Sequence, residues 1–309
     1  MSDRLLKTLA AALALLVIAW GVARLVSSRG GGPESAPFGL TAGTEPELDS
    51  VVVAGAADTV RLVAGDGWTV NEHEALPDAG ESLGQALESA QLGALVSRNP
   101  ENHERLGVTG AKGRRLTVYA GGETRLSLII GGRADVFDRS YVRREGDDEV
   151  YTLQGSLVNL ANRKVDDWRN KEILNANRGD MQRIELAYAE DTVVLVRDSA
   201  GWSLEPGSAV AEPGAMEPLL SQLANLRAIG FAADSIADTL SWATPTGRVR
   251  VLGPGGAELA ELVFLEREEG IGYFVRRGGS PVVYTISAYT GESILKREED
   301  LTGAQEVSG

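Results

Sequence analysis

The sequence predicts an α+β fold in which two tandem copies of a mostly antiparallel sheet unit follow an N-terminal transmembrane helix. Three observations lead to this prediction: an internal repeat, short β-branched runs separated by glycine turns, and an apolar N-terminal stretch. The repeat is clearest in two segments, Y-V-R-R…V-Y-T-L from Tyr141 and F-V-R-R…V-Y-T-I from Phe274. They lie 133 residues apart (274 − 141). This period indicates a duplicated domain, because solenoid units run about 20–50 residues.

Shorter matches in the same order extend the repeat along both halves of the chain. Corresponding pairs are Asp58 with Asp191, Trp68 with Trp202, Leu116 with Val249, and Asp167 with Asp300. Ordered matches whose offset changes by only one residue are hard to obtain by chance. We therefore expect repeat unit 1 over residues 48–174, repeat unit 2 over residues 181–302, and a disordered tail over residues 303–309.

Each unit is expected to contain short strands, one amphipathic helix, further strands and a short closing helix. Strands are predicted over residues 50–54, 59–63, 68–71, 115–120, 125–130, 140–144 and 149–153 in unit 1, and over 183–188, 192–197 and 202–205 in unit 2. Amphipathic helices are predicted over residues 78–92 and 215–226, and closing helices over 156–162 and 289–296. The glycine pairs 121–122, 255–256 and 278–279 predict hairpin turns.

Composition excludes several classes of function. The chain has 309 residues, a formal net charge of −14 and no cysteine. An acidic surface repels nucleic acid, so no nucleic-acid partner is expected. Without cysteine there are no disulfides, no thiolate metal ligands and no cysteine nucleophile.

The N-terminal 26 residues have the character of a membrane anchor. An uncharged, apolar stretch from Thr8 to Ala23 would span about 24 Å as a helix, and the flanking Lys7 and Arg24 can snorkel to the membrane surface. A Gly/Ser/Pro-rich flexible linker is expected over residues 27–47. The alternative is a signal peptide cleaved after Gly21-Val22-Ala23. The anchor would make the chain a single-pass protein of the inner (cytoplasmic) membrane, with its N-terminus inside and its bulk in the periplasm or outside.

No residue pattern indicates catalysis, a cofactor or a metal. The two histidines, His73 and His103, lack a partner at zinc-ligand spacing and are expected at the surface or at a helix start. The glycines of residues 107–113 precede a strand, the wrong order for a phosphate loop. Residues 147–149 (Asp-Asp-Glu) lack the spacing of a calcium loop and are expected in a solvated turn.

The most distinctive polar cluster is Asp166, Asp167, Trp168 and Arg169. In one interpretation an aspartate caps a helix and the tryptophan packs at the domain edge. In the other, the cluster is a contact between the repeats or with a partner, because Trp and Arg are enriched in interface hot spots. The second copy keeps the acidic residues but has Leu301 in place of the tryptophan, an asymmetry that makes this cluster the candidate inter-repeat or partner contact.

The chain resembles the bacterial domain-of-unknown-function family numbered forty-three forty. The resemblance rests on the N-terminal anchor, the duplicated unit, S-R-N-P-E-N-H over residues 97–103, Y-V-R from Tyr141, and D-D-W-R-N-K from Asp166. It implies a membrane-anchored protein often encoded beside ABC-type transporter permease and ATPase components and a gliding-motility-type auxiliary protein. No catalytic residues come with it.

We therefore expect a non-enzymatic, membrane-tethered extracytoplasmic binding or scaffold protein, an accessory of an ABC-type transporter complex. Its expected partners are the membrane, through the N-terminal helix, and an ABC-type permease or auxiliary protein. Two alternatives remain open: an extracytoplasmic hydrolase that uses carboxylates, and ligand capture at the junction of the two repeats.

Overall fold

A computed structural model describes residues 48–135, 138–207, 209–267 and 271–302 of the chain. These residues form two compact units, the first ending at Trp168 and the second beginning at Arg169. This boundary lies before residue 174, where the first unit was expected to end. The anchor expected over residues 1–26, the linker over 27–47 and the tail over 303–309 lie outside the described ranges. Within those ranges, no helix is long and apolar enough to cross a membrane.

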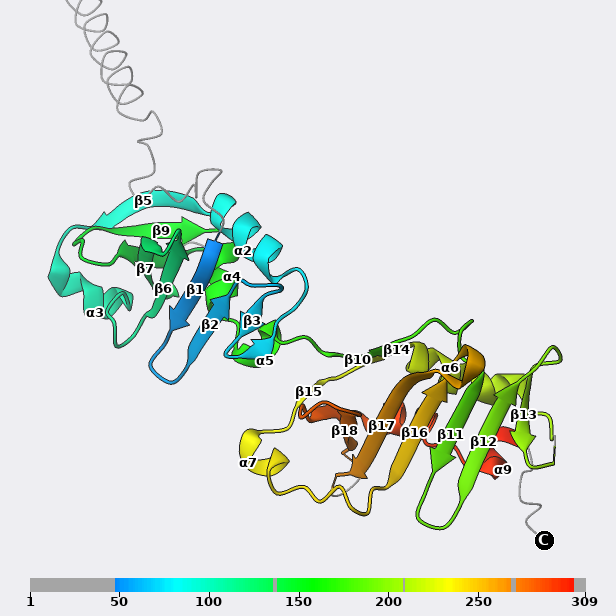
Figure 1. Cartoon of the computed structure of the whole chain (residues 1–309). Helices are drawn as coiled ribbons and strands as arrows, with labels where there is room; N and C mark the ends of the chain where they lie inside the picture. Colours follow the sequence, from blue (N-terminus) through cyan, green and yellow to red (C-terminus); the bar gives the residue numbers. More distant parts are fainter. Residues whose placement is uncertain (1–47, 136–137, 208, 268–270, 303–309) are drawn as a thin grey trace, which may run out of the picture. The chain divides into compact units, whose positions relative to one another are not determined.

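The fold is mixed α+β and dominated by antiparallel strand pairs, as predicted (Figure 1). The strands of unit 1 are β1 (Leu48–Ala54), β2 (Thr59–Val63), β3 (Thr69–Val70), β4 (His73–Glu74), β5 (Gln91–Ser97), β6 (Arg114–Ala120), β7 (Glu123–Arg133), β8 (Ser140–Arg144) and β9 (Val150–Gln154). Its helices are α2 (Ala79–Glu88), the 3-10 helix η1 (Pro100–Asn102), α3 (His103–Leu106), α4 (Ser156–Ala161) and α5 (Val165–Trp168).

Unit 2 repeats this order of elements with small local differences. Its strands are β10 (Glu172–Asn175), β11 (Arg183–Ala187), β12 (Thr192–Arg197), β13 (Trp202–Glu205), β14 (Asn225–Arg227), β15 (Gly230–Phe231), β16 (Gly247–Leu252), β17 (Glu258–Glu266), β18 (Tyr273–Arg277) and β19 (Tyr284–Ile286). Its helices are α6 (Pro213–Ala224), α7 (Asp234–Ala237), the 3-10 helix η2 (Pro254–Gly256), α8 (Ala288–Ile294) and α9 (Glu298–Thr302).

The two sheets have the same order of eight strands, and the sheet of unit 1 has the additional edge strand β4. Among the described residues, the sheet of unit 1 runs β4-β3-β2-β1-β6-β7-β8-β9-β5, and that of unit 2 runs β13-β12-β11-β16-β17-β18-β19-β15. The register is also repeated. Val51 lies opposite Leu62 and Val118, and Ile184, 133 residues later, lies opposite Leu195 and Val251. The internal repeat of the sequence is therefore a repeat of topology and of strand register.

The predicted helices are present, but the ends of two of them and the number of closing helices were wrong. The helix expected over residues 78–92 ends at Glu88, and the chain then forms β5, which pairs antiparallel with β9. The helix expected over residues 215–226 is α6, which begins at Pro213 and ends at Ala224. Residues 225–226, expected at the end of this helix, lie in β14, which pairs with β10. The closing segment of each unit contains two short helices, α4 and α5 or α8 and α9, where one was expected.

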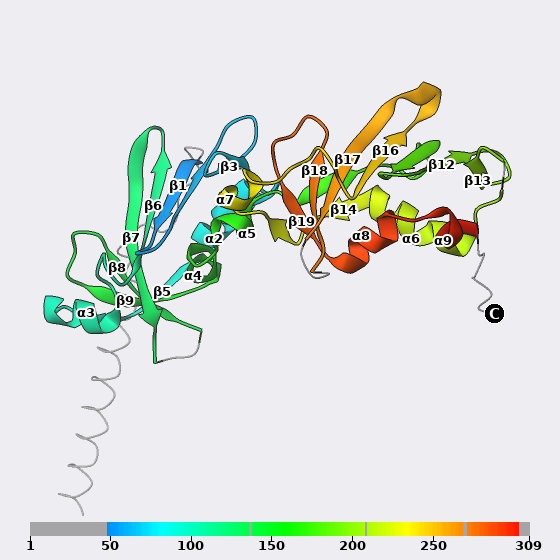
Figure 2. The same cartoon turned by 90° about the horizontal axis from the view of Figure 1, so that it is seen from below.

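Each sheet buries one face beneath its helices. In unit 1 the alternate strand residues Val51, Leu62 and Leu116 pack with Leu83 of α2 and Leu157 of α4 in one core. In unit 2, α6, α8 and α9 lie together on one side of the sheet (Figure 2), and their apolar side chains join a second core. Because side chains alternate along a strand, the opposite face of each sheet carries the remaining residues. We call this second surface the open face.

The chain segment between the edge strand and β6 or β16 covers part of each open face. In unit 1, Leu106 and Val108 of this segment pack on Ile129 and Val150 in a small separate cluster. The repeated motif supplies an arginine that holds the segment: the Arg143 side chain donates from Nε to the Val108 carbonyl at 3.1 Å. In unit 2 its counterpart Arg276 stacks over Trp242, 4.9 Å from the ring centroid.

One corner of the fold exchanges its large and small residues between the copies. In unit 1, Gly55 leaves room for Arg114, which pairs with Asp58 at 3.0 Å. In unit 2 the position of Gly55 is taken by Tyr188 and that of Arg114 by Gly247, which packs on the tyrosine ring. The repeated aspartate, here Asp191, instead pairs with Arg297 from the α8–α9 connection. Volume and charge are thus conserved although the residues that supply them are not.

We predict that Gly55→Tyr and Arg114→Gly are coupled. Gly55→Tyr alone should destabilise the protein by about 1–3 kcal/mol, because the ring would overlap the guanidinium group. Arg114→Gly alone should also destabilise, because Asp58 loses its partner. The double variant should lose less stability than the sum, with a coupling of about 0.5–3 kcal/mol. Chemical denaturation of the four proteins measures this coupling, and strictly additive losses would contradict the exchange.

Candidate functional site

The predicted cluster at residues 166–169 straddles the boundary between the units. Trp168 is 0% exposed and belongs to the core of unit 1. Its backbone carbonyl accepts a hydrogen bond from the Leu76 N–H at 2.8 Å. Asp167 accepts from the backbone N–H of Lys164 at 2.9 Å and so caps α5, while Asp166 is exposed in the first turn of that helix. Arg169 belongs to unit 2, where its guanidinium lies 3.4 Å from the ring centroid of Phe231.

The closing helix of unit 2 repeats these contacts. Asp300 accepts from the Arg297 N–H at 2.9 Å, and the Leu301 carbonyl accepts from the Glu212 N–H at 2.8 Å. Leu301 is as fully buried in its core as Trp168 is in its own. Trp168 and Asp167 therefore close unit 1, as the capping interpretation of the sequence held. The indole is core rather than surface, and the exposed members of the cluster are Asp166 and Asp167.

The other residues considered from the sequence also have structural partners. His103 was expected at the surface or at a helix start; it begins α3 but is 9% exposed, and its Nε2 lies 2.9 Å from the carbonyl oxygen of Asp148. That contact fastens the 147–149 turn to α3. Asn99 caps η1 by accepting from the Glu101 N–H at 3.1 Å. Within the described ranges, no group of three or more His, Asp or Glu side chains could hold a metal ion.

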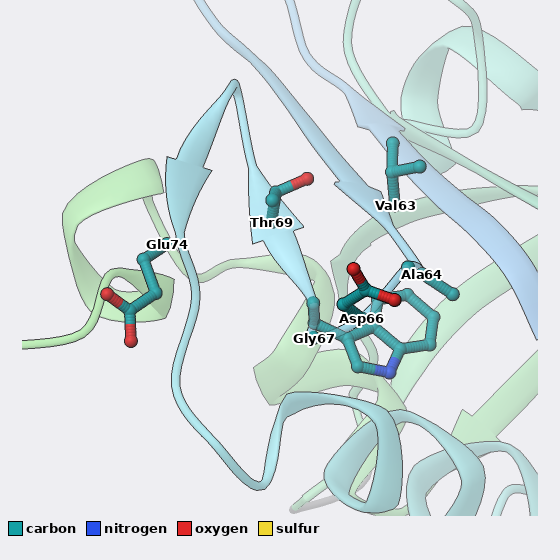
Figure 3. A pocket seen from close by; sticks show the side chains of 8 residues that line it. Val63, Ala64, Asp66, Gly67, Thr69 and Glu74 are labelled. Atoms are coloured by element: carbon teal, nitrogen blue, oxygen red, sulfur yellow. The ribbon is translucent and has the colours of Figure 1, made fainter.

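A hollow on the outer strands of unit 1 was not foreseen from the sequence. It lies at the open face and has two adjoining parts of about 500 and 520 Å³, which share Val63 and Thr69. Figure 3 shows the first part, with Val63 and Thr69 on neighbouring strands and Asp66 in the turn that joins them. The charged residues that line the two parts are Arg61, Asp66, Glu72 and Glu74.

A tight turn at one end of this hollow places Glu72. Val70 pairs with His73, so Asn71 and Glu72 form a two-residue hairpin loop, and both have positive φ, 44° and 70°. Such loops favour Asn-Gly, because glycine adopts the left-handed region without strain. The Asn71 side chain accepts from the Arg61 N–H at 2.7 Å and donates to the Thr59 carbonyl at 2.9 Å. Glu72 therefore occupies a position where the backbone favours glycine.

The same strands of unit 2 carry different chemistry. At the position of Arg61 stands Val194, and at that of Glu74 stands Val210, which pairs with Ser203 and is 71% exposed. Unit 2 instead has a chain of ion pairs on its open face, from Glu205 through Arg183 and Glu185 to Arg250. The positions of Arg183, Glu185 and Arg250 correspond to a serine, a valine and a threonine in unit 1.

The ion pairs of unit 2 shift the ionisation of their members. The side-chain hydrogen bond from Arg183 at 2.8 Å is the main reason that the pKa of Glu185 is lowered. The same bond and that to Glu205 raise the pKa of Arg183. Because these groups remain partly exposed, each pair adds little to stability. Their main effect is to set a fixed pattern of alternating charge on this face.

Comparison with known families gives one match. Residues 68–241 match the family described as Domain of unknown function (DUF4340). The chain belongs to this family. The resemblance proposed from the sequence is thereby confirmed. The match starts in unit 1, at the wall of the hollow, and ends in unit 2, so it includes parts of both units of this DUF4340 protein. No curated protein and no solved structure matches the chain.

We predict that Trp168→Ala destabilises the DUF4340 protein by about 3–5 kcal/mol, the usual cost of removing a large buried aromatic side chain. Trp168→Phe keeps part of the buried volume and should cost less. The melting temperature of both variants gives the answer. An unchanged melting temperature for Trp168→Ala would contradict the core position of the indole and favour a partner surface.

We also predict that Glu72→Gly stabilises the protein by about 1 kcal/mol, because a left-handed conformation costs a non-glycine residue about 1–2 kcal/mol. Glu72→Ala is the matched control: it removes the carboxylate but keeps the strained backbone, so it should give no comparable gain. Denaturation midpoints distinguish the two. Equal stabilisation by both variants would assign the effect to charge and refute backbone strain.

Proposed function

We propose that this DUF4340 protein is a non-enzymatic, membrane-tethered extracytoplasmic binding or scaffold protein that serves as an accessory of an ABC-type transporter complex. The observation that carries the proposal is the contrast between the two units. They share strand order, register and helix closure, yet their open faces differ in chemistry. A common scaffold that presents two different surfaces suits a protein that binds more than one partner surface.

The repeated polar residues support a scaffold because they hold the fold together. Asp167 and Asp300 cap the closing helices, and Asp58 pairs with Arg114 within its own unit. Arg143 and its counterpart Arg276 hold the segments that cover the open faces. The role of these residues is therefore to stabilise the fold that supports the two open faces.

The hollow of unit 1 is the surface we propose for partner binding. It joins an apolar wall at Val63, which is 37% exposed, to the charged side chains of Arg61 and Glu72. Apolar surface with a few placed charges is the composition from which specific recognition sites are built. The hollow lies where the two copies differ, since Val194 of unit 2 stands at the position of Arg61.

The membrane tether and the transporter partner rest on the sequence. The apolar stretch bounded by Lys7 and Arg24 supports a tether that would hold both units close to the membrane surface. The family resemblance supports a permease or a gliding-motility-type auxiliary protein as the partner. We propose that the tether places the protein at the membrane and that the open faces contact this partner.

We predict that the full chain, purified from native membranes in mild detergent, carries an ABC-type permease or auxiliary protein with it. Arg61→Glu should reduce this recovery several-fold, because it reverses the positive charge in the hollow while leaving the strand backbone in place. Arg144→Glu, an exposed arginine on β8, is the matched control and should retain the partner. Recovery of the chain alone, or equal loss with both variants, would count against the proposal.

A further inference from the structure

Among the residues that the structure describes, no strand pairs with the outer side of the edge strand β5 of unit 1. It is the last strand of its sheet in the part of the chain that the structure describes, and it pairs only with β9 there. It has seven residues, whereas the corresponding strand of unit 2, β15, has two. A longer edge presents more free backbone N–H and C=O groups to another strand. Unit 1 therefore offers an edge for strand addition that unit 2 largely lacks.

The side chains of β5 suit pairing with an apolar, uncharged strand. Leu95 and Val96 are 38% and 39% exposed, so β5 carries apolar side chains that are not buried in unit 1. No residue from Ser89 to Ser97 is charged, and none is a proline, so every residue retains its N–H. Charged side chains and proline are common means by which edge strands avoid pairing. β5 has neither.

Close packing holds β5 in place against its neighbour. A Cβ atom on Gly93 would lie 2.2 Å from the Thr152 hydroxyl oxygen, so only glycine permits this approach. The corresponding Gly230 of β15 also faces a threonine, Thr285 of the second V-Y-T motif, but less closely, because a Cβ atom there would lie 3.3 Å from the hydroxyl oxygen. A glycine–threonine contact between the edge strand and its neighbour thus occurs in both units. In unit 1 it holds β5 against β9 and leaves the outer side of β5 facing away from the sheet.

The charges at the two ends of β5 indicate which strand would pair with it. Glu88, exposed at the end of α2, lies before the strand. Arg98 follows it, with a side chain that is 73% exposed and whose Nε lies 3.9 Å from the Glu149 carboxylate. Two antiparallel copies of β5 would bring the positive end of each toward the negative end of the other. Elsewhere, two chains of net charge −14 repel each other. A second copy therefore complements this edge in hydrogen bonding, in apolar character and in charge.

We propose that unit 1 associates with a second copy of the chain through antiparallel β5–β5 pairing. The interface is isologous, as in most homodimers, since the same strand contributes from both copies. Pairing along one strand buries a small area, so the dimer should be weak and reversible. Because the pairing uses the β5 edge, it leaves the hollow on the opposite edge of the sheet available.

The absence of cysteine makes the proposal directly testable. Ala94→Cys and Leu95→Cys, introduced one at a time into the full chain, place the only thiol near the centre of the strand. Under mild oxidation, at least one of them should form a disulfide-linked dimer on a non-reducing gel. Val63→Cys is the matched control, because Val63 has a similar exposure, 37%, on the opposite side of the sheet. It should cross-link several-fold less.

Charge exchange provides the second arm of the test. Added to the cross-linking variant, Arg98→Glu should reduce dimer formation several-fold, and Glu88→Arg combined with Arg98→Glu should restore it. Melting temperatures establish that each variant is folded. The proposal is overturned if folded β5 cysteine variants stay monomeric, if Val63→Cys cross-links equally well, or if charge reversal has no effect.

Discussion

Pairing of the central strand on both sides is the constraint on which each unit depends. β1 lies between β2 and β6, and β11 lies between β12 and β16, in the same register. This register places Val51 and Val53, or Ile184 and Leu186, on the face that the helices cover. A shift of one residue would move every core-facing side chain of the strand to the open face. The helices pack on the core face that this register creates, and the covering segments lie on the opposite face.

Around that fixed centre, the copies have diverged by compensation. The corner at Gly55 and Arg114 becomes Tyr188 and Gly247, so the space remains filled although the large residue has moved to the other strand. Trp168 and Leu301 occupy equivalent positions in the closing segments, and each is buried in the core of its own unit. Close-packed interiors tolerate changes that conserve volume far better than changes that do not. The backbone register therefore survives in both units.

The open faces and the sheet edges do not have to fill a closed core. There the copies differ in their charged side chains and in the length of the edge strand. Unit 1 has the hollow with Arg61 and Glu72 and the long edge strand β5, and unit 2 has the ion-pair chain through Arg183 and Arg250. The proposed partner surface and the proposed self-association edge both lie in unit 1. They lie at opposite edges of the sheet.

The sequence by itself determined the duplication, the α+β class, most strands and the glycine hairpin turns, because these depend on local patterns and on ordered matches. It also indicated the family and, as one of two interpretations, an aspartate cap at residues 166–167, which the structure assigns to Asp167. Tertiary structure alone decided the strand character of Q-L-G-A-L-V-S, whose composition is compatible with a continued helix until β9 supplies its hydrogen bonds. The burial of His103 and the hollow between residues 59 and 74 likewise depend on contacts between segments distant in the chain. Such contacts follow from the packing of the whole unit, which no local pattern encodes.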